Sequence, residues 1–174
     1  MAETRLVSCT KVVDDMSRIP DIRAEAYLNR GIAKEDLGQR AGAIDDYTEG
    51  LRLNPEYRAL YRRRGLAYDQ DGKADLAIAD FSRAIRLDPT DTEALLYRGL
   101  SYAAQEDHDR AMLDYNAALA ENPNDTDVLI SRGESLEALG QRDKAIADFR
   151  KALELDPDSD DAEEGLARLG ASRK

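Results

Sequence analysis

The residues best suited to catalysis or metal binding are too few and too scattered to form a site. The 174-residue chain has one cysteine, Cys9, and one histidine, His108. A single thiol and a single imidazole far apart in sequence cannot complete a zinc site or form a catalytic thiol–imidazole pair, and no glycine-rich phosphate loop accompanies them. We therefore expect no catalytic residue, no metal and no cofactor, and the chain is predicted not to be an enzyme.

Charged residues, by contrast, recur at a fixed spacing. An arginine stands at every 34th position: Arg30, Arg64, Arg98 and Arg132. Aspartates keep the same step: Asp46, Asp80, Asp114 and Asp148. Matching steps predict ion pairs between neighbouring helices that fix their register, a role in which partly buried pairs supply specificity more surely than stability. The alternative is a row of anion-binding arginines, which the adjacent aspartates would neutralise.

The same 34-residue step runs through the uncharged positions. Glycine follows each of the four arginines, and four of the five prolines fall on one column. The glycines are Gly31, Gly65, Gly99 and Gly133, and the prolines are Pro55, Pro89, Pro123 and Pro157. Small residues occupy Ala43, Ala77, Ala111 and Ala145, as well as Gly50, Ala84, Ala118 and Ala152. Aromatic residues occupy Tyr47, Phe81, Tyr115 and Phe149. Repetition at this length indicates a stacked array of identical supersecondary units.

These columns resemble the tetratricopeptide repeat, a helix–turn–helix unit of 34 residues, in its bacterial form. The resemblance covers four consecutive repeats: 24–57, 58–91, 92–125 and 126–159. It implies an all-α fold, a right-handed superhelical α-solenoid in which each repeat contributes a first and a second helix. The small residues let the two helices of a repeat approach closely, the aromatic residue fills the space between repeats, and the proline ends the second helix. The arginine column departs from the family, which usually has a large apolar residue there.

The turns between helices carry their own signals. Gly38, Gly72 and Gly140 follow the first helices and suit a left-handed C-terminal cap, whereas the third repeat has Glu106 at that place. A non-glycine residue held in that conformation should cost about 1 kcal/mol. Asp75, Asp109 and Asp143 are predicted to cap the second helices. His108, in the polar turn after Glu106, is predicted to be a solvated loop residue.

The two ends of the chain are predicted to differ from the repeats. Residues 1–23 are interpreted as a half-repeat helix, with Cys9 in the aromatic column, and a linker about four residues longer than the others. Cys9 is interpreted as a small buried thiol. The alternative is a cysteine whose disulfide partner lies in lost upstream sequence. Residues 160–174 are interpreted as a capping helix, Ala162 to Leu169, and a tail.

The resemblance also implies a binding surface, because the family usually binds peptides on the concave face lined by first helices. Carried onto this sequence, the contact positions have an apolar centre flanked by charged residues. They include Leu28, Ile32, Glu35, Arg62, Arg63, Leu66, Asp69, Leu96, Tyr97, Leu100, Ile130 and Glu134. An apolar groove rimmed by acids predicts a protein or peptide partner with apolar anchors and some basic residues. The alternative is that these side chains pack against neighbouring helices and bind nothing.

Some members of the family clamp the C-terminal carboxylate of heat-shock chaperones with lysines and asparagines. Here the corresponding positions include Leu28, Ile32 and Tyr97, so that activity is not expected. The net charge of −11 argues against nucleic acid, which requires a basic face. No segment is apolar enough to predict a membrane span or a signal peptide. The chain is interpreted as cytoplasmic as given, and as exported or periplasmic if its N-terminus is processed or trimmed.

Two functions from different classes fit these patterns. The first is a protein–protein interaction module, an adaptor or scaffold that holds a peptide or a helix in its groove. The second is a structural protein that assembles with itself, because an unpaired N-terminal helix and open solenoid ends could stack between copies to form a homo-oligomer. The sequence favours the first.

Overall fold

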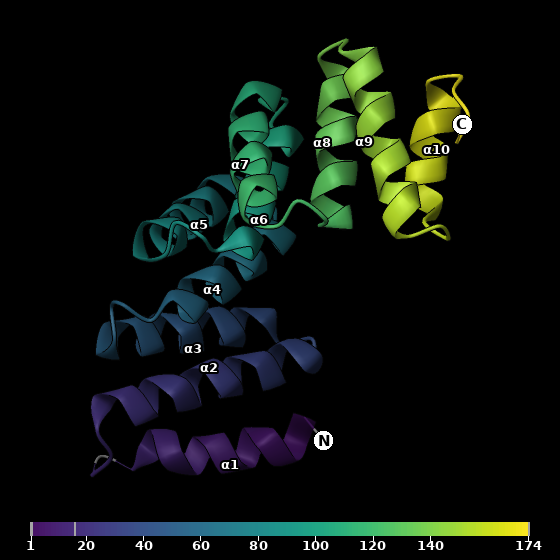
Figure 1. The fold of residues 1–174 in the computed structure, drawn as a ribbon. Coiled ribbons are helices and arrows are strands. Elements are labelled where there is room, and N and C mark those ends of the chain that lie inside the picture. Colours follow the sequence, from purple (N-terminus) through teal and green to yellow (C-terminus); the bar gives the residue numbers. More distant parts are fainter. Residues whose placement is uncertain (1, 16, 174) are drawn as a thin grey trace. The chain divides into compact units, whose positions relative to one another are not determined.

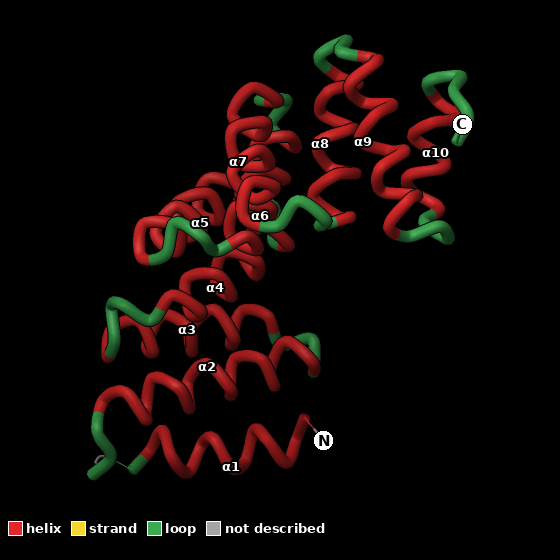
Figure 2. The backbone as a smooth tube through the Cα atoms, viewed as in Figure 1, coloured by secondary structure: helices red, strands yellow, loops and turns green. Residues whose placement is uncertain are grey.

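The structure is a computed structural model that describes residues 2–15 and 17–173. Ten α-helices and no strand occur in these residues, and they form an all-α helical-repeat solenoid, as predicted (Figure 1; Figure 2). The chain divides into two compact units, 1–89 and 90–174, which we call the N-terminal and C-terminal units.

The N-terminal unit consists of a lone helix followed by two helix pairs. The lone helix is α1 (Ala2–Asp14). The first pair is α2 (Pro20–Asp36) and α3 (Arg40–Leu53), and the second is α4 (Arg58–Gln70) and α5 (Ala74–Leu87). Each helix packs against the next along the chain, and a cluster around Tyr47 and Leu60 forms part of the core. Here α2 and α4 are the first helices of repeats, and α3 and α5 are the second helices.

The C-terminal unit has two helix pairs followed by a short helix. The pairs are α6 (Thr92–Ala104) with α7 (His108–Glu121), and α8 (Thr126–Ala138) with α9 (Arg142–Leu155). The short helix α10 (Asp160–Arg168) packs on both α8 and α9. It begins two residues before the predicted start at Ala162 and buries Ala162, Gly165 and Leu166. In both units the second helices end two residues before a proline, which disfavours helical backbone at the residue preceding it.

The helices of each pair meet where an aromatic ring lies against a glycine. A Cβ atom added to Gly65 would lie 2.8 Å from the ring of Phe81, and one added to Gly99 would lie 2.5 Å from that of Tyr115. Gly31 with Tyr47 and Gly133 with Phe149 are equally close. All four aromatic residues are completely buried. The glycine and aromatic columns are therefore two sides of one contact.

The turn after each first helix uses left-handed backbone. Gly38, Gly72 and Gly140 have φ angles of 70–72°, and Glu106 in the third repeat has φ of 61°. Glu106 therefore keeps the conformation that glycine adopts elsewhere, at the steric cost of a Cβ atom.

The predicted caps of the second helices are wrong. The N-cap positions are Gln39, Lys73, Asp107 and Gln141, and the last three lie two residues before the aspartates that we expected to cap. Of these four, only Asp107 caps with its side chain, which accepts a hydrogen bond from the backbone N–H of Arg110. Asp75, Asp109 and Asp143 lie instead in the first helical turn, where a carboxylate favours the positive end of the helix dipole.

None of the helices in the described residues is both long and apolar enough to cross a membrane. The same residues contain no group of three or more histidine, cysteine, aspartate and glutamate side chains that could hold a metal ion.

The turn conformation predicts the effect of one substitution. Glu106→Gly should raise the free energy of unfolding by about 1 kcal/mol, because glycine adopts a positive φ without steric cost. The substitution also removes the contact of Glu106 with His108 at 3.5 Å, but the Glu106 side chain is 90% exposed and such pairs contribute little. Chemical denaturation measures the change as a shift in midpoint at constant slope.

Gly72→Ala is the matched control, since Gly72 has the same turn conformation and open space around it. It should lower stability by about 1 kcal/mol. Equal stability of Glu106→Gly and the unmodified chain would show that the turn in the third repeat is not strained.

Candidate functional site

Each arginine of the 34-residue column lies against the aspartate 16 residues later, on the second helix of its own repeat. Its Nε donates to Oδ2 and its Nη2 to Oδ1, which makes a bidentate pair. The donor–acceptor distances are 2.6–2.9 Å in all four pairs: Arg30–Asp46, Arg64–Asp80, Arg98–Asp114 and Arg132–Asp148. We call these pairs the arginine–aspartate ladder.

The two partners of the ladder differ in burial. The aspartates are buried in every repeat, 3–7% exposed, whereas the arginine side chains are 16–24% exposed. The hydrogen bonds to Asp46 raise the pKa of Arg30, and those to Asp114 raise the pKa of Arg98. The guanidinium groups of Arg30 and Arg98 therefore stay charged, and every guanidinium of the ladder neutralises a largely buried carboxylate.

Further donors extend the ladder beyond single pairs. The Nη1 of Arg64 donates to Thr48 Oγ1 at 3.0 Å, on the second helix of the preceding repeat. The Nη1 of Arg132 donates in the same way to Asn116 Oδ1 at 2.8 Å. In the first repeat, Lys34 Nζ adds a second cation 2.9 Å from Asp46. Arg64 and Arg132 thus connect the first helix of a repeat to two second helices.

Tyrosines accompany the ladder, and sequence analysis did not assign them a role. The guanidinium of Arg30 lies 5.2 Å from the ring centre of Tyr27, and that of Arg64 lies 5.9 and 5.8 Å from Tyr61 and Tyr68. At these separations a cation is attracted to the face of an aromatic ring. The signal was present in the spacing, because these tyrosines stand three residues before or four after an arginine on the same helix.

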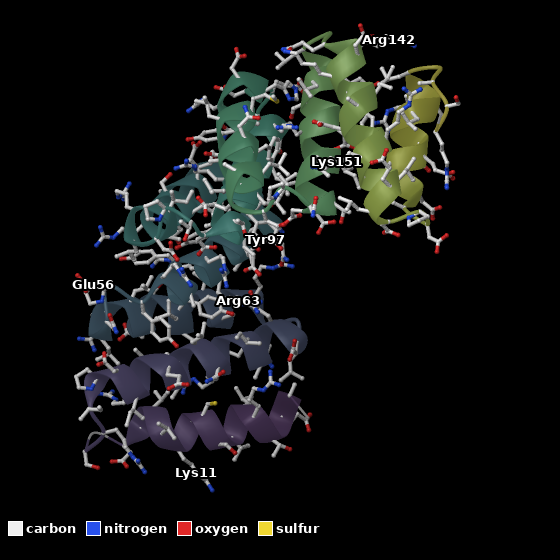
Figure 3. The ribbon with its side chains drawn as sticks, viewed as in Figure 1. Lys11, Glu56, Arg63, Tyr97, Arg142 and Lys151 are labelled. Carbon is white, nitrogen blue, oxygen red and sulfur yellow. The ribbon has the colours of Figure 1, made fainter. Side chains whose placement is uncertain are left out.

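The predicted binding residues of the N-terminal unit lie on α2 and α4. Leu28, Ile32 and Leu66 are half-buried, and Leu28 packs against the core cluster around Tyr47. Glu35 accepts a hydrogen bond from the Tyr47 hydroxyl at 2.8 Å and lies 3.9 Å from Arg63 Nη1. The remaining predicted residues here are Arg62, which is half-buried, and Asp69, which is exposed. Apolar and charged side chains therefore share this surface, which includes the labelled Arg63 in Figure 3.

The predicted binding residues of the C-terminal unit lie on α6 and α8. Leu96, Tyr97 and Ile130 are half-buried and Leu100 is exposed. Glu134 is exposed, yet partial burial of its carboxyl raises its pKa, and Arg168 of α10 lies 3.8 Å away and opposes that shift. We call the exposed faces of α2 and α4, and of α6 and α8, the first-helix surfaces of the two units.

His108 does not lie where the sequence predicted. It is the first residue of α7, its side chain is only 16% exposed, and its Nδ1 lies 3.2 Å from Ser135 Oγ on α8. The prediction of a solvated loop residue is therefore wrong, because the turn ends one residue earlier and directs the ring towards the neighbouring helix. Cys9 is half-buried on α1, and this burial raises the pKa of its thiol.

Known protein families and solved structures match the repeats of this chain. A family model described as Tetratricopeptide repeat matches residues 28–92 and 64–126, and a second model with the same description matches residues 126–159. The chain belongs to the tetratricopeptide-repeat family. The two models together cover three quarters of the chain, including the whole arginine–aspartate ladder. No match was found among curated proteins.

Solved structures of tetratricopeptide-repeat proteins resemble this fold. MamA is 27% identical with a TM-score of 0.78, and the alignment covers 94% of this chain and 89% of MamA. YrrB, described as having an unusual peptide-binding site, is 24% identical with a TM-score of 0.80, over 95% of this chain and 84% of its own. The first repeat domain of Spaghetti (RPAP3), bound to the HSP90 peptide SRMEEVD, is 27% identical with a TM-score of 0.67, over 69% and 98% of the two chains.

The ladder predicts strong coupling between its partners. Arg98→Leu leaves the buried Asp114 carboxylate without its cation and should lower the free energy of unfolding by about 3 kcal/mol. Asp114→Leu should cost less, because the side chain of Arg98 is 21% exposed and reaches water. The double variant should lose about 2 kcal/mol less than the sum of the two single losses, as denaturant titration of all four proteins would measure. Additive losses would contradict a structural role for the pair.

Proposed function

We propose that the chain is a protein-interaction module that binds a peptide or a helical segment on its first-helix surfaces. The observation that carries this proposal is the combination of apolar side chains left partly open to solvent with carboxylates beside them. Apolar anchors fit the former, and basic side chains of a partner fit the latter.

The N-terminal unit supports the proposal through α2 and α4. Leu28, Ile32 and Leu66 are only half-buried, whereas Leu60 on α4 is fully covered. Glu25 and Asp36 of α2 are exposed beside them. The Arg63 guanidinium lies near Glu35, which offsets part of its charge on this surface. A partner segment that covers the leucines would gain hydrophobic contact.

The C-terminal unit makes the stronger case for a basic partner. Helices α6 and α8 contain four acidic residues and two arginines, and both arginines are held by ladder aspartates. Leu100 of α6 is 37% exposed. Asp127 and Glu134 are exposed, and Arg168 from α10 lies 3.8 Å from Glu134. This surface is therefore acidic with an apolar centre.

The solved neighbours agree with this class of function. YrrB and the Spaghetti (RPAP3) domain are described as binding peptides on the same fold. Fold alone does not identify a partner, so the chemistry assigned here comes from the residues of this chain.

Self-assembly is the second candidate. The observation that favours it is the pair of open grooves beside α1 and α10.

Charge introduced at the apolar centre should abolish binding. Leu66→Glu in the N-terminal unit and Leu100→Glu in the C-terminal unit place a carboxylate where a partner's apolar side chain would lie, which costs several kcal/mol unless it is paired. We expect at least a tenfold loss of affinity for a bound peptide, measured by fluorescence anisotropy, with the helical circular dichroism unchanged.

Leu113→Glu is the matched control, because Leu113 is 69% exposed on the second helix α7. It should leave peptide affinity unchanged. Loss of binding in this control, or full binding by both first-helix variants, would overturn the proposed surface.

The proposal also predicts which peptides bind. The HSP90 peptide SRMEEVD should not bind measurably, because its carboxylates would meet an acidic surface on a chain of net charge −11. A variant of that peptide with both glutamates replaced by lysine and the final aspartate by leucine should bind, and added salt should weaken it. Isothermal titration of both peptides at two salt concentrations decides the matter. Tighter binding of the acidic peptide would refute the predicted partner chemistry.

A further inference from the structure

Helix α1 has the features of a second helix of a repeat. Its Thr10 hydroxyl donates to the carbonyl of Leu6, just as Thr48 on α3 donates to Ile44. In this register Cys9 takes the place of Tyr47, and Val13 is buried as Leu51 is. Among the described residues, no first helix belongs to this half-repeat.

An open groove marks the side of α1 where such a first helix would lie. It has a volume of about 250 Å³ and is mainly apolar. Its lining residues come from α1 and α2: Ser8, Cys9, Val12, Ile22, Glu25, Ala26 and Asn29.

The equivalent positions one repeat further on hold a first helix in this structure. Asp46, the counterpart of Ser8, binds Arg30 of α2, and the ring of Tyr47, the counterpart of Cys9, lies against Gly31. Gly50 replaces Val12 there and lies close to Tyr27. On α4, Arg63 takes the place of Asn29 and lies 3.9 Å from Glu35 of α2. The groove beside α1 thus corresponds to the position that α2 occupies in the next repeat.

Helix α10 has the register of the first helix of a repeat. Leu166 and Ala167 stand one repeat after Arg132 and Gly133, which face the second helix α9. Ala167 keeps the small side chain that lets a second helix approach. A groove of about 280 Å³ lies on this side of α10, and its lining residues are Glu163, Leu166, Ala167, Ala171, Ser172 and Arg173. The groove is the seat of a second helix that the described residues do not supply.

We propose that α10 of one copy docks in the groove between α1 and α2 of a second copy and completes a tetratricopeptide repeat with α1. Ala167 then lies against Cys9, as Gly31 lies against Tyr47. The contact joins different surfaces of the two copies, so it builds rings or open chains rather than closed two-fold dimers. This inference does not depend on peptide binding by the first-helix surfaces.

Two observations favour a second copy over an unrelated helix. In repeat register, α1 is a second helix and α10 is a first helix, so one chain carries both halves of a repeat. The charged lining residues also permit a contact of opposite charges, because Glu25 lines the groove beside α1 and Arg173 lines the groove beside α10.

The first test is the mass of the full chain by light scattering after size exclusion, over a wide range of protein concentrations. The average mass should rise with concentration above that of one 19.3 kDa chain. Val12→Glu, which places charge in the groove, should return the chain to a monomer. Val7→Glu is the matched control on the same helix, since Val7 is 57% exposed and does not line the groove, and it should assemble normally.

The second test locates the contact through the single native cysteine. Ala167→Cys should form a disulfide with Cys9 of the next copy under diamide, which accepts the two electrons and two protons released by the thiols. A non-reducing gel should then show covalent dimers and larger species. Glu164→Cys, at an exposed position of α10 outside its groove, should give far fewer covalent species. Ala167→Cys combined with Cys9→Ser should lose the covalent dimers and larger species.

Three results would overturn the proposal. One is a monomeric mass at every concentration, which would leave the grooves to another occupant. Another is assembly that Val12→Glu does not affect. The third is equal cross-linking by Ala167→Cys and Glu164→Cys, which would show collision rather than a specific contact.

Discussion

An aromatic ring packed directly on a glycine is the contact on which every repeat depends. Where Phe81 meets Gly65, even one added carbon atom would lie 2.8 Å from the ring, so the ring lies directly against the backbone of the first helix. That separation places the arginine next to each glycine within reach of its aspartate on the facing helix. It also leaves the opposite face of each first helix partly open. The core, the ion pairs and the exposed surface thus follow from one short distance.

The arginine–aspartate ladder adds specificity to this close approach. A buried carboxylate is costly to desolvate, and its bidentate guanidinium recovers that cost only in one geometry. A register shift of one residue between the helices would separate Arg64 from Asp80 and leave a charge without a partner. We infer that the ladder replaces part of the apolar packing usual in the family with contacts that tolerate less error. The rings of Tyr27 and Tyr68 lie 5.2 and 5.8 Å from the guanidinium groups of Arg30 and Arg64 and attract their positive charge.

Sequence reasoning succeeded where a residue type has one physical use at a fixed step. The glycine, aromatic and proline columns predicted the helical repeats because close approach, ring packing and helix ending admit few substitutes. It failed at helix starts, since Asp75 suits both a cap and a first turn, and only tertiary packing decides between them. It also failed for His108, whose environment comes from Ser135 on another helix. The binding surface remains a prediction, because exposed side chains show where a partner could bind and not which partner binds.

Contacts between helices hold the repeats together, and we propose that the open faces of the first helices bind the partner. Amide chemical shifts of isotopically labelled chain, recorded during titration with a peptide that carries apolar and lysine residues, test this division most directly. We predict that the shift changes concentrate on α2, α4, α6 and α8, around Leu66 and Leu100. Changes concentrated on the second helices α3, α5, α7 and α9, or no changes at all, would contradict the central claim.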